Sequence, residues 1–212
     1  MNEKPRIVIV GPVPPPVGGV ETYTSIMLNS DIKERFDILH CNITKGRPKQ
    51  TQGKFDLGNI IWAFRHFKRL KDSIKKHQPA LVYMPISSTR SGFMRDSVLI
   101  RIVKKARRLL VGHVHGGDFD NLYNSANTAK KKHIVSVLNM CDMLVLLGSR
   151  WETFLREVGV TKPIRIAPAT IREELYEAGI KVKRNCEQPE RVVVLFVGQI
   201  GKRKGVFDIL EA

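Results

Sequence analysis

Short apolar runs of strand length recur along this chain, and the stretches between them have the length and period of helices. The runs are Ile7–Val10, Phe36–His40, Leu81–Met84, Leu109–Val114, Met143–Leu147, Ile164–Ala167 and Val192–Val197. Strands that alternate with helices form βαβ units, and right-handed crossovers then give a parallel sheet covered on both sides. The sequence therefore predicts an α/β fold with a Rossmann-like parallel sheet and helices on both faces.

Three segments are expected along the chain. Residues 1–170 contain six of the runs and predict one N-terminal Rossmann-like domain. Residues 171–190 carry charges, a glycine and a proline without a clear strand, which indicates a linker. Residues 191–212 hold one strand and the start of one helix, which are too few elements for a core, so we interpret them as the truncated start of a second domain.

The charge balance is strongly positive. The chain has 36 Lys and Arg against 20 Asp and Glu, a formal net charge of +16. Such a field favours anionic partners, but no nucleic-acid-binding module is recognisable, so nucleic acid is disfavoured. No signal peptide or spanning apolar run is found. We expect a cytoplasmic protein, with any membrane contact peripheral and on the inner face.

The stretch between residues 59 and 77 shows the clearest helical period. Apolar residues recur on one face at Ile60, Ile61, Phe64, Phe67, Leu70 and Ile74. Cations fill much of the rest, at Arg65, Lys68, Arg69, Lys71, Lys75 and Lys76. Aromatic and basic residues on one helix are typical of contact with an anionic membrane. An ordinary surface helix whose aromatic rings pack on the sheet would show the same pattern.

The first run leads into a glycine pair, Gly18-Gly19, at the start of a helical stretch. The N–H groups and the positive end of a helix that begins here point beyond the carboxyl edge of the sheet and favour an anion. Glycine also lets a phosphate approach the backbone closely. The pair predicts a phosphate site, although it could serve only to make the turn, and the G-x-G-x-x-G motif is absent.

Two histidines follow the fourth run, in His113-Val114-His115. We expect their side chains to face opposite ways, with His115, nearer the edge, donating a hydrogen bond to a ligand and His113 serving structure. An imidazole can do this near neutral pH without a fixed charge. No third ligand at a suitable spacing accompanies them, so no metal is expected. The three scattered cysteines predict neither a disulfide framework nor a zinc site.

Two cations are further candidates. Lys204 lies between the last run and a helical stretch, where a cation is favourable only if an anion bridges it to the helix terminus. It is expected to bind a diphosphate, with a solvated lysine as the alternative. Arg95 is a weaker candidate for an acceptor contact, and the alternative is an ion pair with Asp96.

In this order along the chain, the features resemble the family-4 (group 1) glycosyltransferases of the GT-B architecture. Gly18, Gly19 and Glu21 match the family's Gly-Gly-x-Glu loop, and His115 matches its rim histidine. The family's donor domain opens with V-G-R and, further on, K-G. The corresponding residues here are Val197, Gly198, Lys204 and Gly205.

Three departures accompany the resemblance. Gln199 stands where the family has an arginine that contacts the leaving diphosphate. Ala169-Thr170-Ile171 replaces the family's Asn-Gly turn. The family's later glutamate motif, which handles the donor sugar, lies beyond Ala212, so we expect this chain to fold without catalysing.

The resemblance implies a retaining glycosyltransferase that moves a sugar from a nucleotide-sugar donor to a sugar or lipid-linked acceptor in glycan, polysaccharide or glycolipid synthesis. His115 would be catalytic, Gly18, Gly19 and Lys204 would hold the donor phosphates, and Arg95 would contact the acceptor. No cofactor is implied. The main alternative is a non-enzymatic, basic membrane- or polyanion-binding module. An epimerase or dehydrogenase would require a tighter glycine motif than Gly11 to Gly19 provides.

Overall fold

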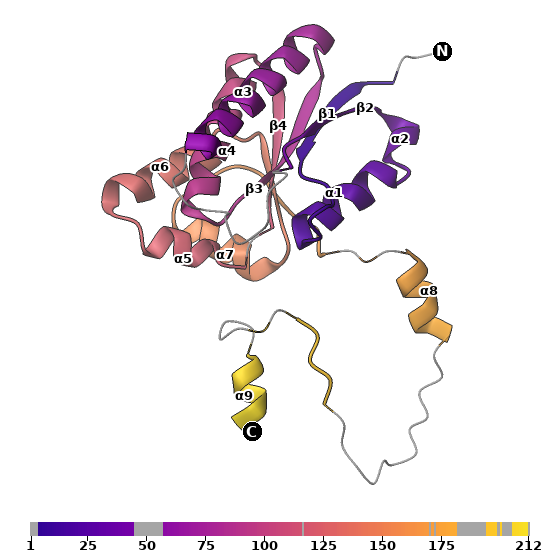
Figure 1. The fold of residues 1–212 in the computed structure, drawn as a ribbon. Coiled ribbons are helices and arrows are strands. Elements are labelled where there is room, and N and C mark those ends of the chain that lie inside the picture. Colours follow the sequence, from indigo (N-terminus) through magenta and orange to yellow (C-terminus); the bar gives the residue numbers. More distant parts are fainter. Residues whose placement is uncertain are drawn as a thin grey trace. The chain divides into compact units, whose positions relative to one another are not determined.

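A computed structural model describes residues 4–44, 57–115, 117–169, 171, 173–181, 194–198, 200 and 205–211. The chain divides into two compact units, Met1–Thr170 and Ile171–Ala212. The first contains the sheet and the helices that cover it, and the described residues of the second form two short helices (Figure 1).

All strands of the sheet run parallel. They are β1 (Arg6–Gly11), β2 (Asp37–Asn42), β3 (Leu81–Ile86), β4 (Leu109–Val114), β5 (Met143–Leu146) and β6 (Ile164–Ile166), in the order β2-β1-β3-β4-β5-β6. Each lies within a residue or two of a run expected from the sequence. The predicted α/β, Rossmann-like fold with a parallel sheet is confirmed.

Helices pack on both faces of this sheet. One face carries α1 (Gly19–Asn29) and α2 (Ile32–Arg35), and the other carries α3 (Leu57–His77), α4 (Arg90–Lys105), α5 (Phe119–Asn124), α6 (Thr128–Leu138) and α7 (Ser149–Glu157). Successive side chains of a strand point to opposite faces. Ile7 and Ile9 of β1 therefore pack in the cluster under α1, while Val8 and Val10 pack in the larger one.

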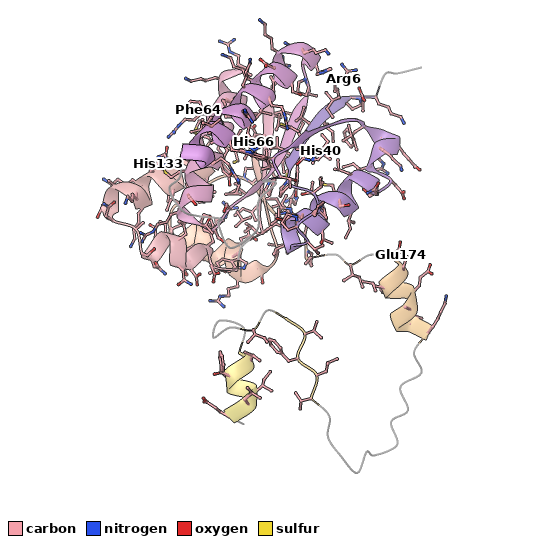
Figure 2. All side chains as sticks on the ribbon, in the orientation of Figure 1. Arg6, His40, Phe64, His66, His133 and Glu174 are labelled. Carbon is pink, nitrogen blue, oxygen red and sulfur yellow. The ribbon has the colours of Figure 1, made fainter. Side chains whose placement is uncertain are left out.

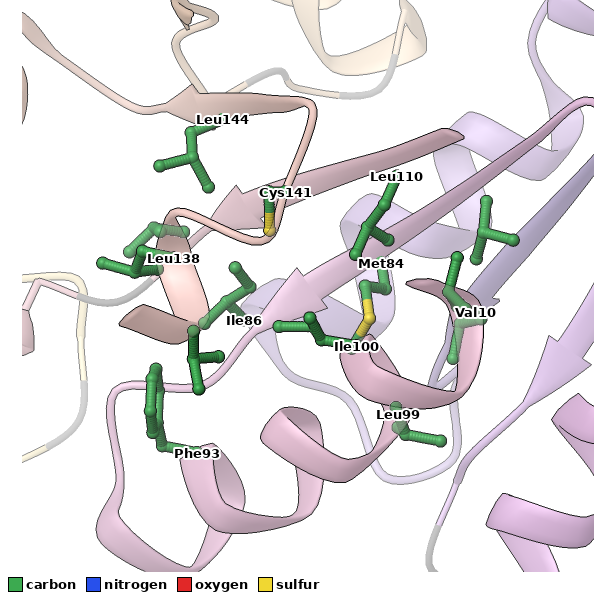
Figure 3. Packing of buried hydrophobic residues seen from close by; sticks show 14 of the residues in the cluster. Val10, Met84, Ile86, Phe93, Leu99, Ile100, Leu110, Leu138, Cys141 and Leu144 are labelled. Atoms are coloured by element: carbon green, nitrogen blue, oxygen red, sulfur yellow. The ribbon is translucent and has the colours of Figure 1, made fainter. Parts of the chain in front are cut away.

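The larger cluster is the main core of the protein. It joins the sheet to α4, α5 and α6 through side chains that are almost completely buried, among them Met84, Leu99, Ile100, Leu110 and Leu138 (Figure 3). Fully burying a side chain of this size stabilises the fold by about 1.5–3 kcal/mol relative to leaving it in water. No helix in the described part of the chain is both long and apolar enough to cross a membrane.

The strand order places a topological switch between β1 and β3. The chain leaves β1 through α1 to reach β2 on one side, and β3 then lies on the other side of β1. The segments after β1 and β3 therefore lead to helices on opposite faces of the sheet. In open α/β sheets, ligands bind outside the carboxyl ends of the strands at such a switch.

The second unit differs from the sequence expectation. Residues 194–197, the described part of the run at Val192–Val197, are not in a strand, and Val194, Leu195 and Val197 are exposed. A strand forms only when its backbone N–H and C=O groups find partners, and local apolar character cannot supply them. The expected linker contains helix α8 (Glu173–Lys181), and α9 (Val206–Glu211) follows.

The close approach of α1 to β1 depends on Gly11, the last residue of β1. A Cβ added to Gly11 would lie 2.7 Å from Oγ1 and 2.8 Å from Cγ2 of Thr24, which is buried on α1. We therefore expect Gly11→Ala to lower the free energy of unfolding by about 1–3 kcal/mol, because overpacking forces the helix away from the strand. Urea denaturation measures this loss. An unchanged midpoint would show that α1 adjusts without cost.

Candidate functional site

The segment after β1 brings the start of α1 to the carboxyl edge of the sheet. Gly18 is the N-cap residue, with an extended backbone (φ −158°, ψ 168°), and no side chain caps the helix. A Cβ added to Gly19 would meet nothing within 4 Å. Any residue adopts the Gly18 conformation, so the turn does not require glycine at this position, and Gly19 has room for a side chain.

The two histidines of β4 and its end lie together rather than on opposite faces. The rings of His113 and His115 stack with their centroids 3.8 Å apart and their planes at 28°. The expectation that they face opposite ways is wrong, because residues two apart in a strand lie on the same face. His113 is fully buried, whereas His115 is partly exposed at the end of the strand.

Two tyrosines complete this histidine–tyrosine cluster, which we define as Tyr23, Tyr83, His113 and His115. The Tyr83 hydroxyl, from β3, is 2.6 Å from Nδ1 of His113 and 3.4 Å from Nε2 of His115. The Tyr23 ring, from α1, meets both imidazoles edge-on, at centroid distances of 5.1 and 4.6 Å. The second turn of α1 therefore contacts the histidines of β4 directly, next to the topological switch.

Burial keeps both imidazoles neutral. Desolvation lowers the pKa of His115 from 6.5 to about 4. Desolvation, followed by the nearby His115, lowers the pKa of His113 to about 3. In the described part of the chain, Nε2 of His113 is buried without a hydrogen-bond partner. Near neutral pH, His115 can therefore exchange hydrogen bonds with a ligand, but it contributes no positive charge.

The turn after β3 forms a second helix start at the same edge. Thr89 caps α4 by accepting a hydrogen bond from the backbone N–H of Gly92. Asp96, which is completely buried, accepts a hydrogen bond from the backbone N–H of Ser87 at 2.8 Å. Nε of Arg95 donates to the same carboxylate at 2.8 Å. Arg95 thus forms the ion pair with Asp96 that was the alternative to an acceptor contact. The Asp96 carboxylate, through its bond to Ser87, stabilises the turn between β3 and α4.

Lys204 and Gln199 lie outside the described residues, so the expected diphosphate contact stays a prediction. Among the residues that the structure does describe, no group of three His, Cys, Asp or Glu side chains could hold a metal ion.

An open hollow on the surface lies away from the carboxyl edge, beside the edge strand β2. Its lining residues are Lys4, Leu28, Lys33, Phe36, Asp37, Ile38 and His40. Lys4 there donates to the backbone carbonyl of Lys33. None of the residues singled out from the sequence lines this hollow, so it is not the candidate site.

Sequence reasoning missed the two tyrosines, and it named Asp96 as a partner of Arg95 without predicting its burial. Tyr83 lies in an otherwise apolar strand, where a hydroxyl must find a buried partner, and this was the available signal. Tyr23 gave no such signal, because its contact with β4 depends on how α1 crosses the sheet.

The lowered histidine pKa values predict a loss of stability in mild acid. The unfolded state takes up protons on His113 and His115 as pH falls through about 6.5, but the folded state does so only near 3 and 4. Stability contributed by the neutral imidazoles is therefore complete above pH 6.5 and is lost on acidification. Urea denaturation at pH 7 and pH 5 should show a fall of about 1–2 kcal/mol per histidine. His115→Gln should flatten this dependence, because it removes one of the two buried imidazoles; a slope equal to that of the parent chain would contradict it.

Comparisons with known proteins give no family for this chain. No protein-family model matches it, and no curated protein matches it significantly. One similar solved structure is described as a candidate phosphomethylpyrimidine kinase from Bacteroides thetaiotaomicron VPI-5482. It is 15% identical, with a TM-score of 0.48, over 80% of this chain and 64% of that chain. The present chain thus spans less than two thirds of that protein, and a likeness this low assigns no activity to it.

These findings correct the expected membership of the family-4 glycosyltransferases. Neither comparison by sequence supports the GT-B assignment, because no family model and no curated protein matches the chain. The retaining glycosyl transfer expected from Gly18, Gly19, His115 and Lys204 is withdrawn with it, and the non-enzymatic binding module gains no support either. Short glycine and lysine motifs at strand–helix turns recur in many α/β proteins because the turns themselves recur.

Proposed function

We propose that the first unit is the ligand-binding domain of an enzyme that acts on a small anionic molecule. A phosphate or carboxylate group of this molecule would lie above the switch between β1 and β3. The observation that carries the proposal is the strand order, which sends the chain after β1 and after β3 to opposite faces of the sheet. This is the position at which open α/β sheets bind ligands.

The start of α1 supports an anionic group at this position. No side chain caps the helix, and the space over Gly19 is open, so its first N–H groups are available to a ligand. Glu21 already places one negative charge in the first turn. The ligand anion would therefore bind through the backbone N–H groups of Gly18 and Gly19, which precede Glu21 in the helix.

The histidine–tyrosine cluster supports an enzyme. Titratable groups with strongly shifted pKa values beside a ligand site are typical of active sites. His115 is partly exposed, and burial lowers its pKa to about 4. It would hydrogen-bond to the uncharged part of the ligand, or accept a proton from it, while Tyr83 positions its ring.

A charge placed at Gly19 tests the proposal. Gly19→Asp should leave the fold stable, because its Cβ has room and an acidic residue in the first turn favours a helix. It should nevertheless weaken binding of inorganic pyrophosphate by about tenfold or more, since the new carboxylate takes the place of the anion. Isothermal titration calorimetry at low salt measures the dissociation constant.

Gly148→Asp is the matched control. Gly148 is the N-cap of α7, after β5 at the same edge, and its Cβ also meets nothing within 4 Å. This variant should bind pyrophosphate as the parent chain does. Absence of binding by the parent chain, or an equal loss in the two variants, would place the anion site elsewhere.

We also propose that the domain contacts anionic membranes peripherally. The net charge of +16 supports this, since each Lys or Arg near an anionic surface contributes about 1 kcal/mol. Co-sedimentation with vesicles containing phosphatidylglycerol should be clear at low salt and weaker at high salt, because salt screens the attraction. The same result with uncharged vesicles would contradict it.

A further inference from the structure

Helix α3 carries an unusual outward face. Two large apolar side chains at its N-terminal end are exposed to solvent, Ile61 at 55% and Phe64 at 66%. Exposed cations continue the same face for three further turns. We define the α3 surface as Ile61, Phe64, Arg65, Lys68, Lys71 and Lys75, all of which are exposed.

The opposite face of α3 is firmly held. Leu70 and Ile74 are buried in the main core, and Phe67 packs against it. The two phenylalanines of this helix therefore differ in their surroundings. Phe67 packs against the core, as an aromatic residue of an ordinary surface helix does. Phe64, in contrast, lies on the side away from the sheet, opposite the buried His66 (Figure 2). The Phe64 ring meets that of Phe67 edge-on at a centroid distance of 6.0 Å, yet 66% of Phe64 stays exposed to solvent.

The charges around Phe64 are almost all of one sign. Asp72 is the single acidic residue between Leu57 and His77. Arg69, beside the α3 surface, is turned toward β2, where its guanidinium donates to the backbone carbonyl of Asn42 at 3.1 Å. The cations of the α3 surface remain exposed. This helix face has apolar side chains at one end and cations along the rest. Such a face is complementary to a surface layer that is anionic on the outside and apolar beneath.

We propose that the α3 surface docks on the headgroup layer of an anionic membrane, with Ile61 and Phe64 entering the acyl boundary. This inference rests on the proposed membrane association, and it specifies the surface that makes the contact. Lys68, Lys71 and Lys75 meet the lipid phosphates, while α3 lies along the membrane plane. A nucleic acid would stack a base on Phe64, but it would offer nothing apolar to Ile61.

The apolar contribution is tested with the full chain and vesicles of phosphatidylcholine with 30% phosphatidylglycerol. Phe64→Ser should lower the partition coefficient about tenfold. The variant lacks the phenyl ring, at least half of which would be transferred from water into the membrane when the parent chain binds. Met94→Ser is the matched control, since Met94 is a 58% exposed apolar residue on α4. The control should bind as the parent chain does.

The charge contribution is tested by comparing two double Lys→Glu variants, one on α3 and one on α6. Lys68→Glu with Lys75→Glu should lower partitioning about 25-fold or more, because each lost cation costs about fivefold. Lys130→Glu with Lys132→Glu on α6 changes the net charge equally, and both side chains are exposed. This control should lose much less binding.

The outcomes separate the surface from the association. If the parent chain binds vesicles but Phe64→Ser and the α3 charge variant bind as their controls do, another surface makes the contact and the present inference is wrong. If the parent chain does not bind, the association fails as well. Retention by the vesicles in the presence of a tenfold excess of single-stranded DNA supports lipid as the occupant, and complete displacement would overturn it.

Discussion

The fold depends on the burial of β1 on both of its faces. Ile7 and Ile9 pack under α1, and Val8 and Val10 pack in the main core, so none of the four side chains meets water. A parallel strand buried in this way requires a helix on each side. The chain meets this requirement by crossing β1 between β2 and β3, and the crossing creates the switch above which the candidate site lies.

The candidate site combines apolar packing with a few buried polar groups. The Tyr83 hydroxyl bonds to His113 inside the protein, and the Tyr23 ring closes over both imidazoles from α1. In such surroundings a charged imidazole would lose hydration, and no acidic group among the described residues offsets this loss, so both histidines stay neutral. The same burial that stabilises the packing of α1 on the sheet therefore sets the chemistry that His115 can perform.

The corrected family assignment shows how little short motifs establish alone. Gly18, Gly19, His115 and Lys204 occur along the sequence in an order that resembles a glycosyltransferase, yet no family model or curated protein matches the chain. Glycines, histidines and lysines gather at strand–helix turns in α/β proteins of many activities, because each turn offers N–H groups and an exposed edge. The strand order and the contacts of His115 are features of the structure itself, and they do not depend on a family assignment.

The sequence by itself determined the alternation of strands and helices, because apolar runs of strand length and helical periods are local properties. It also determined that the sheet is parallel and that Gly18 and His115 follow strands at one edge. Only the tertiary structure decided that Tyr23 contacts His115, that the Tyr83 hydroxyl bonds to His113, and that Phe64 is exposed while Phe67 packs against the core. These outcomes depend on how helices cross the sheet and which partners reach a buried group, and such contacts join residues far apart in the chain.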